Sequence, residues 1–124
     1  MPSELILIVE DNPKNLKLVR DTLQVKVYHT IEAETGEEGV QLARERRPAL
    51  ILMDIQLPGM SGIEAFRELR ADPTTRAIPV IAVTASVMAQ DRQRIMAAGF
   101  DGFQGKPISV RELLATMREI LERS

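Results

Sequence analysis

The stretch ILMDIQLPGMSG, residues 51–62, runs a short apolar segment into an aspartate and then into a turn. Such a continuous apolar run is typical of a strand that is covered on both faces, as in a parallel sheet. A carboxylate on this run, here Asp54 between Met53 and Ile55, is costly unless it is paired, binds a metal or lies at an open end. The sequence therefore predicts that Asp54 has partners elsewhere in the chain.

Apolar runs recur along the chain and alternate with segments of helical periodicity. The predicted strands span residues 5–9, 27–33, 49–53, 79–83 and 100–103. Asn12 followed by Pro13 marks a helix start, and Gly99 marks a helix end. The capping-box spacing, a Ser or Thr with Glu three residues later, occurs at Thr35, Ser61 and Ser109. The alternation of five strands with five helices predicts an α/β fold with a doubly wound parallel sheet.

The composition and charge of the chain narrow its class. Its 124 residues fit one domain, residues 1–124, with 44% hydrophobic and 27% charged residues. A net charge of −2 gives no basic patch for nucleic acid and no polybasic membrane anchor, and the absence of cysteine excludes disulfides and thiolate metal sites. Because there is no signal-peptide pattern and no apolar stretch of about 20 residues, we expect a cytoplasmic protein.

Polar side chains follow four of the five predicted strands. They are Glu10 and Asp11 after the first strand, Asp54 after the third, Thr84 after the fourth and Lys106 after the fifth. Ligands of open parallel sheets bind beyond the carboxyl ends of the strands, so these groups should meet at one edge. Each residue alone has an ordinary role as a helix charge, a cap or a solvated loop residue, but their joint placement favours a site.

The predicted cluster of carboxylates favours a metal. Three carboxylates close together repel one another, so at least one pKa should rise unless a cation intervenes. With oxygen ligands and no cysteine, the fitting cation is hard and divalent, and Mg²⁺ is the natural choice. It would keep Asp54 ionised and nucleophilic, while Lys106 and Thr84 could neutralise and hydrogen-bond a transferring phosphoryl group. The site therefore reads as an acceptor of a phosphoryl group.

The combination of these motifs is similar to one known family. Over its whole length the chain resembles the receiver domain of two-component response regulators. The motifs that carry this resemblance are Glu10-Asp11, Asp54 in MDIQLPGMSG, Thr84-Ala85 and Lys106-Pro107. The resemblance implies a flavodoxin-like (CheY-like) fold, with five helices around a five-stranded sheet of order 2-1-3-4-5. MDIQLP and KPIS resemble in particular the receivers of phosphorelays, hybrid kinases and single-domain DivK-type regulators.

The resemblance also implies roles for the acidic residues and their neighbours. Asp54 would be the phosphoacceptor. Mg²⁺ would be bound by Asp11, Asp54 and the backbone carbonyl of Gln56, with Glu10 acting through water. The side chains of Gln56 and Ser86 would flank the water that hydrolyses the acyl phosphate, and neither is a strong base, so rapid assisted hydrolysis is not expected.

The resemblance implies that the remaining site residues bind the phosphoryl group and respond to its presence. Lys106 would pair with it, held by a cis peptide bond to Pro107, and Thr84 would move to hydrogen-bond it. Phe103 stands where the family carries its switch aromatic, with a core phenylalanine as the alternative. Its inward rotation would change the face made by the fourth helix, fifth strand and fifth helix, which would then bind a downstream protein.

The family resemblance implies a signalling protein and not a conventional enzyme, because it would catalyse only its own phosphotransfer and autodephosphorylation. The donor would be a histidine kinase or a histidine phosphotransfer protein, docking on Asn15, Leu16, Pro107 and Ile108. Three alternatives remain open: the receiver segment of a hybrid kinase, a metal-dependent phosphatase with an aspartyl-phosphate intermediate, and a flavodoxin-like cofactor binder. The acidic site disfavours the last of these.

One segment departs from the family pattern. LQVKVYHT, residues 23–30, lacks the glycine commonly found between the first helix and the second strand, which leaves the length of that helix and its turn open. The only histidine, His29, falls in this region, away from the cluster, and we expect it at the surface or at the sheet edge.

Overall fold

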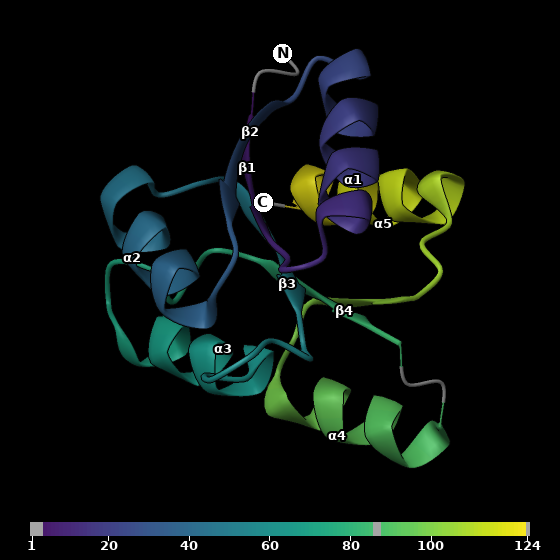
Figure 1. Ribbon diagram of the computed structural model, residues 1–124. Coiled ribbons are helices and arrows are strands. Elements are labelled where there is room, and N and C mark those ends of the chain that lie inside the picture. Colours follow the sequence, from purple (N-terminus) through teal and green to yellow (C-terminus); the bar gives the residue numbers. More distant parts are fainter. Residues whose placement is uncertain (1–3, 86–87, 124) are drawn as a thin grey trace.

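The computed structural model describes residues 4–85 and 88–123, in which five strands and five helices alternate (Figure 1). The strands are β1 (Leu5–Val9), β2 (His29–Ala33), β3 (Leu50–Asp54), β4 (Val80–Thr84) and β5 (Gly102–Gly105). The helices are α1 (Pro13–Val25), α2 (Gly36–Arg46), α3 (Gly62–Ala71), α4 (Ala89–Ala98) and α5 (Val110–Arg123). Neighbouring strands all pair in parallel in the order β2-β1-β3-β4-β5, which confirms the predicted doubly wound, flavodoxin-like fold.

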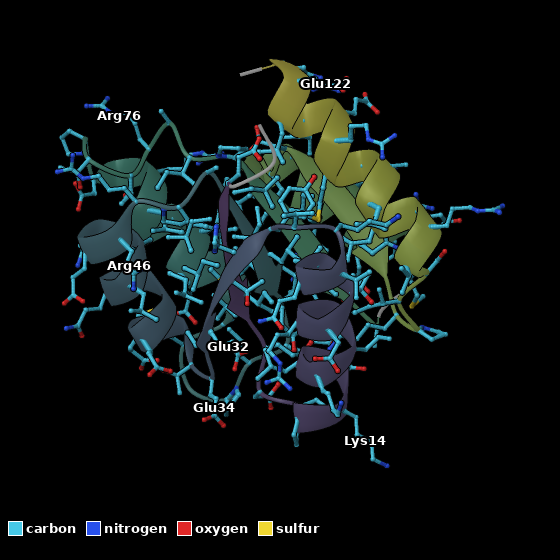
Figure 2. All side chains as sticks on the ribbon, turned by 90° about the horizontal axis from the view of Figure 1, so that it is seen from above. Lys14, Glu32, Glu34, Arg46, Arg76 and Glu122 are labelled. Carbon is cyan, nitrogen blue, oxygen red and sulfur yellow. The ribbon has the colours of Figure 1, made fainter. Side chains whose placement is uncertain are left out.

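Helices cover both faces of the sheet, and the sheet separates two hydrophobic core clusters (Figures 1 and 2). Helices α1 and α5 pack on one face, and the buried side chains there are Ile6, Ile8, Val19, Leu23, Leu50, Leu52, Ile81, Leu113, Met117 and Ile120. Helices α2, α3 and α4 pack on the other face, with Val40, Ala43, Ala65, Phe66, Leu69 and Ile95 buried against the alternate strand residues. Because both faces are covered, the strands read as nearly continuous apolar runs.

The last strand lies two residues later than the sequence predicts. Phe100 and Asp101, expected in the strand, precede β5 and have other roles. The Phe100 ring stacks on Phe66 with centroids 4.0 Å apart. The Asp101 carboxylate accepts from the Val80 N–H at 2.8 Å and pairs with Arg70 at 2.7 Å, so it holds the entry of β4 instead of continuing a strand.

Helix starts follow the predicted capping signals to different degrees. Ser61 and Glu64 form a complete capping box at α3, with both reciprocal hydrogen bonds present. At α2 the Thr35 hydroxyl accepts from the Glu38 N–H, but the Glu38 carboxylate accepts from the residue before Thr35, so only half of the box forms. At α5 the Ser109 hydroxyl accepts the third helical amide at 3.4 Å.

The surface carries charged side chains around the helices, and Lys14, Arg76 and Glu122 point away from the sheet (Figure 2). His29 is exposed on β2, an edge strand, as predicted. Within the described residues, no helix combines the length and apolar character that crossing a membrane would require.

The turn between α1 and β2 forms without the glycine that is commonly found there. The helix ends at Val25, and the Val27 and Tyr28 amides donate to the carbonyls of Gln24 and Leu23 at 3.1 and 3.0 Å. This pattern is a Schellman motif, in which the residue after the C-cap has a positive φ and is usually glycine. Here that residue is Val27 with φ 70°, a strained backbone conformation for a β-branched side chain.

We predict that Val27→Gly raises the stability of the protein. Glycine removes the strain of the positive φ, and little apolar burial is lost because Val27 is 62% exposed. The expected gain is about 1 kcal/mol in the free energy of unfolding, or roughly 4 °C in Tm, measured by thermal denaturation. Val25→Gly is the matched control: it removes an exposed valine from the helical backbone two residues earlier and should destabilise. Equal effects of the two changes would contradict the strain at Val27.

Candidate functional site

The predicted polar residues meet at the carboxyl edge of the sheet. Glu10 directly follows β1, Asp54 ends β3, Thr84 ends β4 and Lys106 directly follows β5. The first three are buried, with exposed fractions of 4%, 2% and 1%. Asp11, next to Glu10, is exposed. The parallel strands therefore bring together side chains that lie up to 96 positions apart in the sequence.

One ammonium group lies against two buried carboxylates. Lys106 Nζ is 3.1 Å from Asp54 Oδ2 and 3.1 Å from Glu10 Oε1. The backbone also contributes, because the Asn12 N–H donates to Glu10 Oε2 at 3.1 Å and the Gln56 N–H donates to Asp54 Oδ1 at 3.0 Å. Two negative charges and one positive charge, with Asp11 beside them, leave the site with excess negative charge.

Burial and the neighbouring charged groups shift the pKa values of two members of this cluster. Burial, followed by the hydrogen bond shared with Asp54, raises the pKa of Glu10 to about 7. Burial alone would lower the pKa of Lys106, but its bonds to Asp54 and Glu10 outweigh this and raise it. Lys106 therefore remains a cation at neutral pH, while Glu10 titrates near neutrality unless another cation neutralises the site.

The acidic residues are arranged so that they could hold a metal ion. Carboxylate oxygens of Glu10, Asp11 and Asp54 all lie within 4.8 Å of one another. They are hard oxygen donors, which fit Mg²⁺, an ion that takes one or two protein carboxylates and completes its shell with water and phosphate oxygens. The unbalanced negative charge supports the same fit, because a divalent cation would allow both buried carboxylates to ionise together.

The arrangement has the parts of a phosphoryl acceptor. Asp54 is held through both oxygens, by the Gln56 N–H and by Lys106, and it lies at the end of its strand, where a ligand can approach. A carboxylate in this position can act as a nucleophile, and an adjacent ammonium can neutralise the charge of an incoming phosphoryl group. The Thr84 carbonyl accepts from the Lys106 N–H at 2.8 Å, so the backbones that carry these two residues are joined.

Phe103, the predicted switch aromatic, is half-buried on β5. It packs against the core on the α2–α4 face, and the Arg92 guanidinium of α4 lies 4.9 Å from its ring centroid. Phe103 therefore already contacts α4. Ser86, predicted to flank the hydrolytic water, lies outside the described residues.

The predicted docking residues lie in the first turns of α1 and in the connection between β5 and α5. Leu16 and Ile108 are partly buried and pack against the same core cluster, the one shared by α1 and α5. Asn15 is partly exposed and Pro107 is exposed. The peptide bond between Lys106 and Pro107 is cis, as the family resemblance implied.

Sequence reasoning missed Gln104, a buried polar residue of β5 with only 5% exposure. It pairs in register with Val83, which pairs in turn with Asp54, so the three side chains form one row across the sheet. Gln104, Glu10 and Asp54 share the lining of a cavity of about 10 Å³. The available signal was positional: once β5 is placed at 102–105, Gln104 shares the α5-facing side with Gly102.

Comparisons with known proteins agree with this geometry. Residues 6–118 match the family model for the response regulator receiver domain. The polar-differentiation response regulator DivK of Brucella anthropi is 48% identical over 116 residues, which cover 94% of each chain, and DivK of Brucella ovis is 47% identical over the same length.

Solved structures show the same likeness. The receiver domain of sensor histidine kinase PA1611 from Pseudomonas aeruginosa PAO1 is 36% identical, with a TM-score of 0.85 and coverage of 98% of this chain and 96% of that one. Its crystal structure has a magnesium ion coordinated in the active site cleft. Chemotaxis protein CheY4 of Vibrio cholerae superposes with a TM-score of 0.87 at 26% identity, covering 94% of this chain and 98% of that one.

Proposed function

Because the chain belongs to the response regulator receiver domain family, we propose that it accepts a phosphoryl group on Asp54 and signals through phosphorylation-dependent protein contacts. The donor is the phosphohistidine of a histidine kinase or of a histidine phosphotransfer protein. The observation that carries the proposal is the position of Asp54: it is buried at the open edge of the sheet, 3.1 Å from the Lys106 ammonium.

In the proposed reaction an Asp54 carboxylate oxygen attacks phosphorus in line with the bond to the donor histidine. The phosphorus–nitrogen bond breaks, its electron pair stays on the imidazole, and an acyl phosphate forms on Asp54. Lys106 neutralises the phosphoryl oxygens, and the Gln56 N–H orients the attacking carboxylate. Mg²⁺, held by Asp11, Asp54 and the Gln56 carbonyl with Glu10 acting through water, would neutralise charge on the phosphoryl group.

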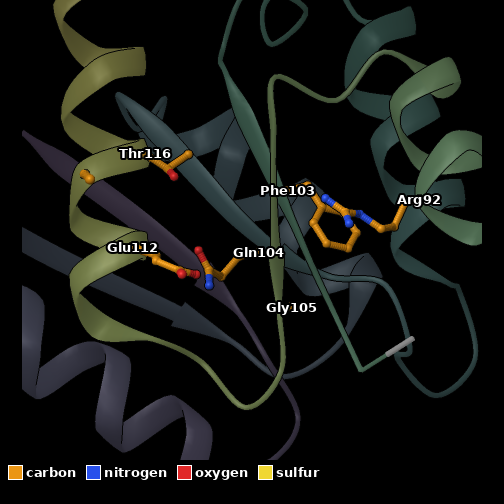
Figure 3. A pocket seen from close by; sticks show the side chains of 7 residues that line it. Arg92, Phe103, Gln104, Gly105, Glu112 and Thr116 are labelled. Atoms are coloured by element: carbon orange, nitrogen blue, oxygen red, sulfur yellow. The ribbon is translucent and has the colours of Figure 1, made fainter. Parts of the chain in front are cut away.

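The signal would pass to the face formed by α4, β5 and α5. Thr84 moves to hydrogen-bond the phosphoryl group, and Phe103 follows it inward. This face contains an open hollow of about 460 Å³ between α4 and α5 (Figure 3). Its lining includes Phe103 and the Arg92 side chain stacked on that ring. Rotation of Phe103 would therefore reshape a surface that a downstream protein can bind.

The lifetime of the acyl phosphate would depend on side chains next to Asp54. Gln56 follows Asp54 by two residues and its side chain lines a second hollow, of about 170 Å³, together with Thr84. We propose that Gln56 and Ser86 tune the access of the hydrolytic water. Neither is a strong base, so hydrolysis should be slow compared with a dedicated phosphatase.

Among the receivers, a single-domain DivK-type role over residues 1–124 is favoured over a segment of a hybrid kinase. The support is the 48% identity to DivK against 36% to the receiver of a sensor histidine kinase. The phosphatase reading has less support, because the pockets beside Asp54 are small or open and offer no enclosed substrate chamber among the described residues. The cytoplasmic location stays a prediction.

We predict that acetyl phosphate with Mg²⁺ adds one phosphate per chain, seen as a single increment in intact mass. The phosphate should be stable in acid and labile to hydroxylamine, as expected of an acyl phosphate, and EDTA should prevent its formation. Turnover of many equivalents of a small phosphoester by the same sample would instead identify a phosphatase. Labelling that persists in EDTA would contradict the metal site.

For the donor, we predict that Leu16→Asp slows phosphotransfer from a phosphohistidine protein roughly tenfold or more while acetyl phosphate still labels Asp54. The charge would replace a partly buried leucine that packs, as Ile108 does, against the core cluster shared by α1 and α5. Leu18→Asp is the matched control, since Leu18 is 42% exposed and lies two residues on, on another side of α1. Thermal denaturation of both variants monitors folding, and unaffected transfer in Leu16→Asp would contradict this docking surface.

A further inference from the structure

Strand β5 lies at the edge of the sheet, and its outer side is open. It is the last strand in the order β2-β1-β3-β4-β5, and among the described strands it pairs with β4 alone. The Lys106 N–H, directly after β5, donates to the Thr84 carbonyl, and alternate residues of a parallel strand bond to the same neighbour. The backbone of Gln104 therefore also faces β4, whereas Phe103 and Gly105 direct their N–H and C=O groups to the free edge. The burial agrees, because Phe103 and Gly105 are partly exposed while Gln104 is buried.

The open hollow of about 460 Å³ lies along this free edge and has two different walls (Figure 3). On one side of β5, the Arg92 guanidinium of α4 lies 4.9 Å from the centroid of the Phe103 ring. On the other side, the Gln104 side chain points toward Glu112 of α5, and Thr116 lies one turn further along that helix (Figure 3). Successive side chains of a strand point to opposite faces, so a strand added to β5 would place alternate side chains against these two walls.

The α5 wall of the hollow offers acceptors that no described residue uses. The Gln104 side chain is only 5% exposed, yet its amide has no hydrogen-bond partner within residues 4–85 and 88–123. The Glu112 carboxylate has no ion pair within the same residues. A buried amide without a partner is costly, so a ligand that supplies the missing bond is favoured here. The carboxylate, the amide oxygen and the Thr116 hydroxyl together fit a cation with several donors, which the guanidinium of arginine provides.

From this edge and these walls we propose that the hollow binds an extended segment of a partner protein. The segment adds to the sheet as a further strand beside β5 and inserts an arginine between Gln104 and Glu112. The inference rests on the proposed function, because it names the kind of downstream partner that the face formed by α4, β5 and α5 takes. Backbone bonds to Phe103 and Gly105 supply affinity, and the arginine supplies specificity. An added Cβ at Gly105 would have no atom within 4 Å, so there is room on the α4 side for a side chain of the segment.

A second copy of this chain fits the free edge less well. Two β5 strands that pair antiparallel about a two-fold axis keep the same face of both sheets on the same side. The α5 walls of the two copies would then meet, and two Glu112 carboxylates would lie on one side of the joined sheet without a cation between them. Arg92 could not neutralise them, because it lies on the other side of β5, against Phe103 (Figure 3). The charges therefore favour a partner that brings its own cation.

The first experiment titrates the protein with the peptide acetyl-Thr-Val-Arg-Val-Thr-amide and follows the backbone amides by NMR. At saturation the Phe103 and Gly105 N–H groups should exchange with water about fivefold more slowly, while Gln104, which already bonds to β4, is unchanged. The same peptide with N-methyl groups on its three central amides cannot pair as a strand and should lose its binding. Equal binding by the methylated peptide, or unchanged exchange at Phe103 and Gly105, would overturn the strand addition.

The second experiment tests the arginine. Glu112→Gln should weaken peptide binding about fivefold, and replacing the arginine of the peptide by citrulline, its neutral analogue, should weaken binding to wild type equally. The two changes together should cost no more than either alone, because they remove the same contact. Glu119→Gln is the matched control, since Glu119 lies on α5 outside the hollow and pairs with Arg123. Additive losses would overturn the contact between the arginine and Glu112.

Beryllofluoride with Mg²⁺, a mimic of the phosphoryl group, separates this inference from the proposed function. If the face signals the state of Asp54, the mimic should tighten peptide binding about threefold or more. Unchanged affinity would contradict the proposed signalling role of this face and leave the strand addition standing. Sedimentation of the protein without peptide tests the other occupant: a dimer in which the Phe103 and Gly105 amides are already protected would overturn the proposal.

Discussion

The Asp54→Asn variant is expected to take up no phosphate from acetyl phosphate, a loss of roughly 100-fold or more in labelling rate. The amide lacks the negative charge that makes the carboxylate nucleophilic. The fold should survive, because asparagine keeps the shape of the side chain and its Oδ1 can still accept from the Gln56 N–H, which lies 3.0 Å away in this structure. Intact mass measures the labelling, and thermal denaturation measures the fold.

Asp21→Asn is the matched control for this prediction. Asp21 is an exposed aspartate of α1 that pairs with Lys17 at 2.7 Å, away from the sheet edge. It should be labelled like wild type and should lose little stability, since exposed ion pairs contribute little. A folded Asp54→Asn variant that still gains one phosphate would place the acceptor on another residue and would remove the basis of the proposed function.

The sequence predicted the site better than it predicted the elements that surround it. Apolar runs alone are enough to locate the residues at the carboxyl ends of β3 and of the other strands. In a parallel sheet these carboxyl ends all lie at one edge. Glu10, Thr84 and Lys106 meet there for that reason, whatever the details of the helices. Asp54 and Thr84 were expected directly after their strands and are the last residues of β3 and β4, so these small boundary errors did not affect the predicted convergence.

The features that could not be predicted depend on contacts between distant segments. β5 contains two glycines and little apolar pattern, so its register depends on contacts made just before it. The Asp101 carboxylate accepts a hydrogen bond from the Val80 N–H of β4, and the Phe100 ring stacks on Phe66. The bond between Gln56 and Ala85 joins residues 29 positions apart and follows from no local pattern. Val27 occupies a position that local rules assign to glycine, because the Schellman hydrogen bonds of α1 outweigh the strain of its backbone.

Gly62→Ala is expected to destabilise the protein by about 2–3 kcal/mol or more, roughly 10 °C in Tm, and to slow phosphorylation of Asp54. Gly62 is the first residue of α3, and its N–H donates to the Ile55 carbonyl at 3.0 Å. A methyl group there would meet the Asp54 carbonyl oxygen, with the Ile55 Cα at 2.7 Å and the Asp54 carbonyl carbon at 2.9 Å. All three are backbone atoms of Asp54 and Ile55, so relief of the clash requires moving either α3 or the end of β3 that carries Asp54, the proposed phosphoacceptor.

Two other glycines separate this backbone clash from the general effect of adding a methyl group. At Gly105, the last residue of β5, an added Cβ would have no atom within 4 Å, so Gly105→Ala should change stability by less than about 0.5 kcal/mol. At Gly39 of α2 the Cβ would meet Val9 side-chain atoms at 2.8 and 3.2 Å, and these can repack, so the loss should be intermediate. Near-normal stability of Gly62→Ala with rapid labelling would mean that α3 does not fix Asp54. The same conclusion would follow if Gly62→Ala lost no more stability than Gly39→Ala. The atoms around Gly62 would then move aside as easily as the Val9 side chain does.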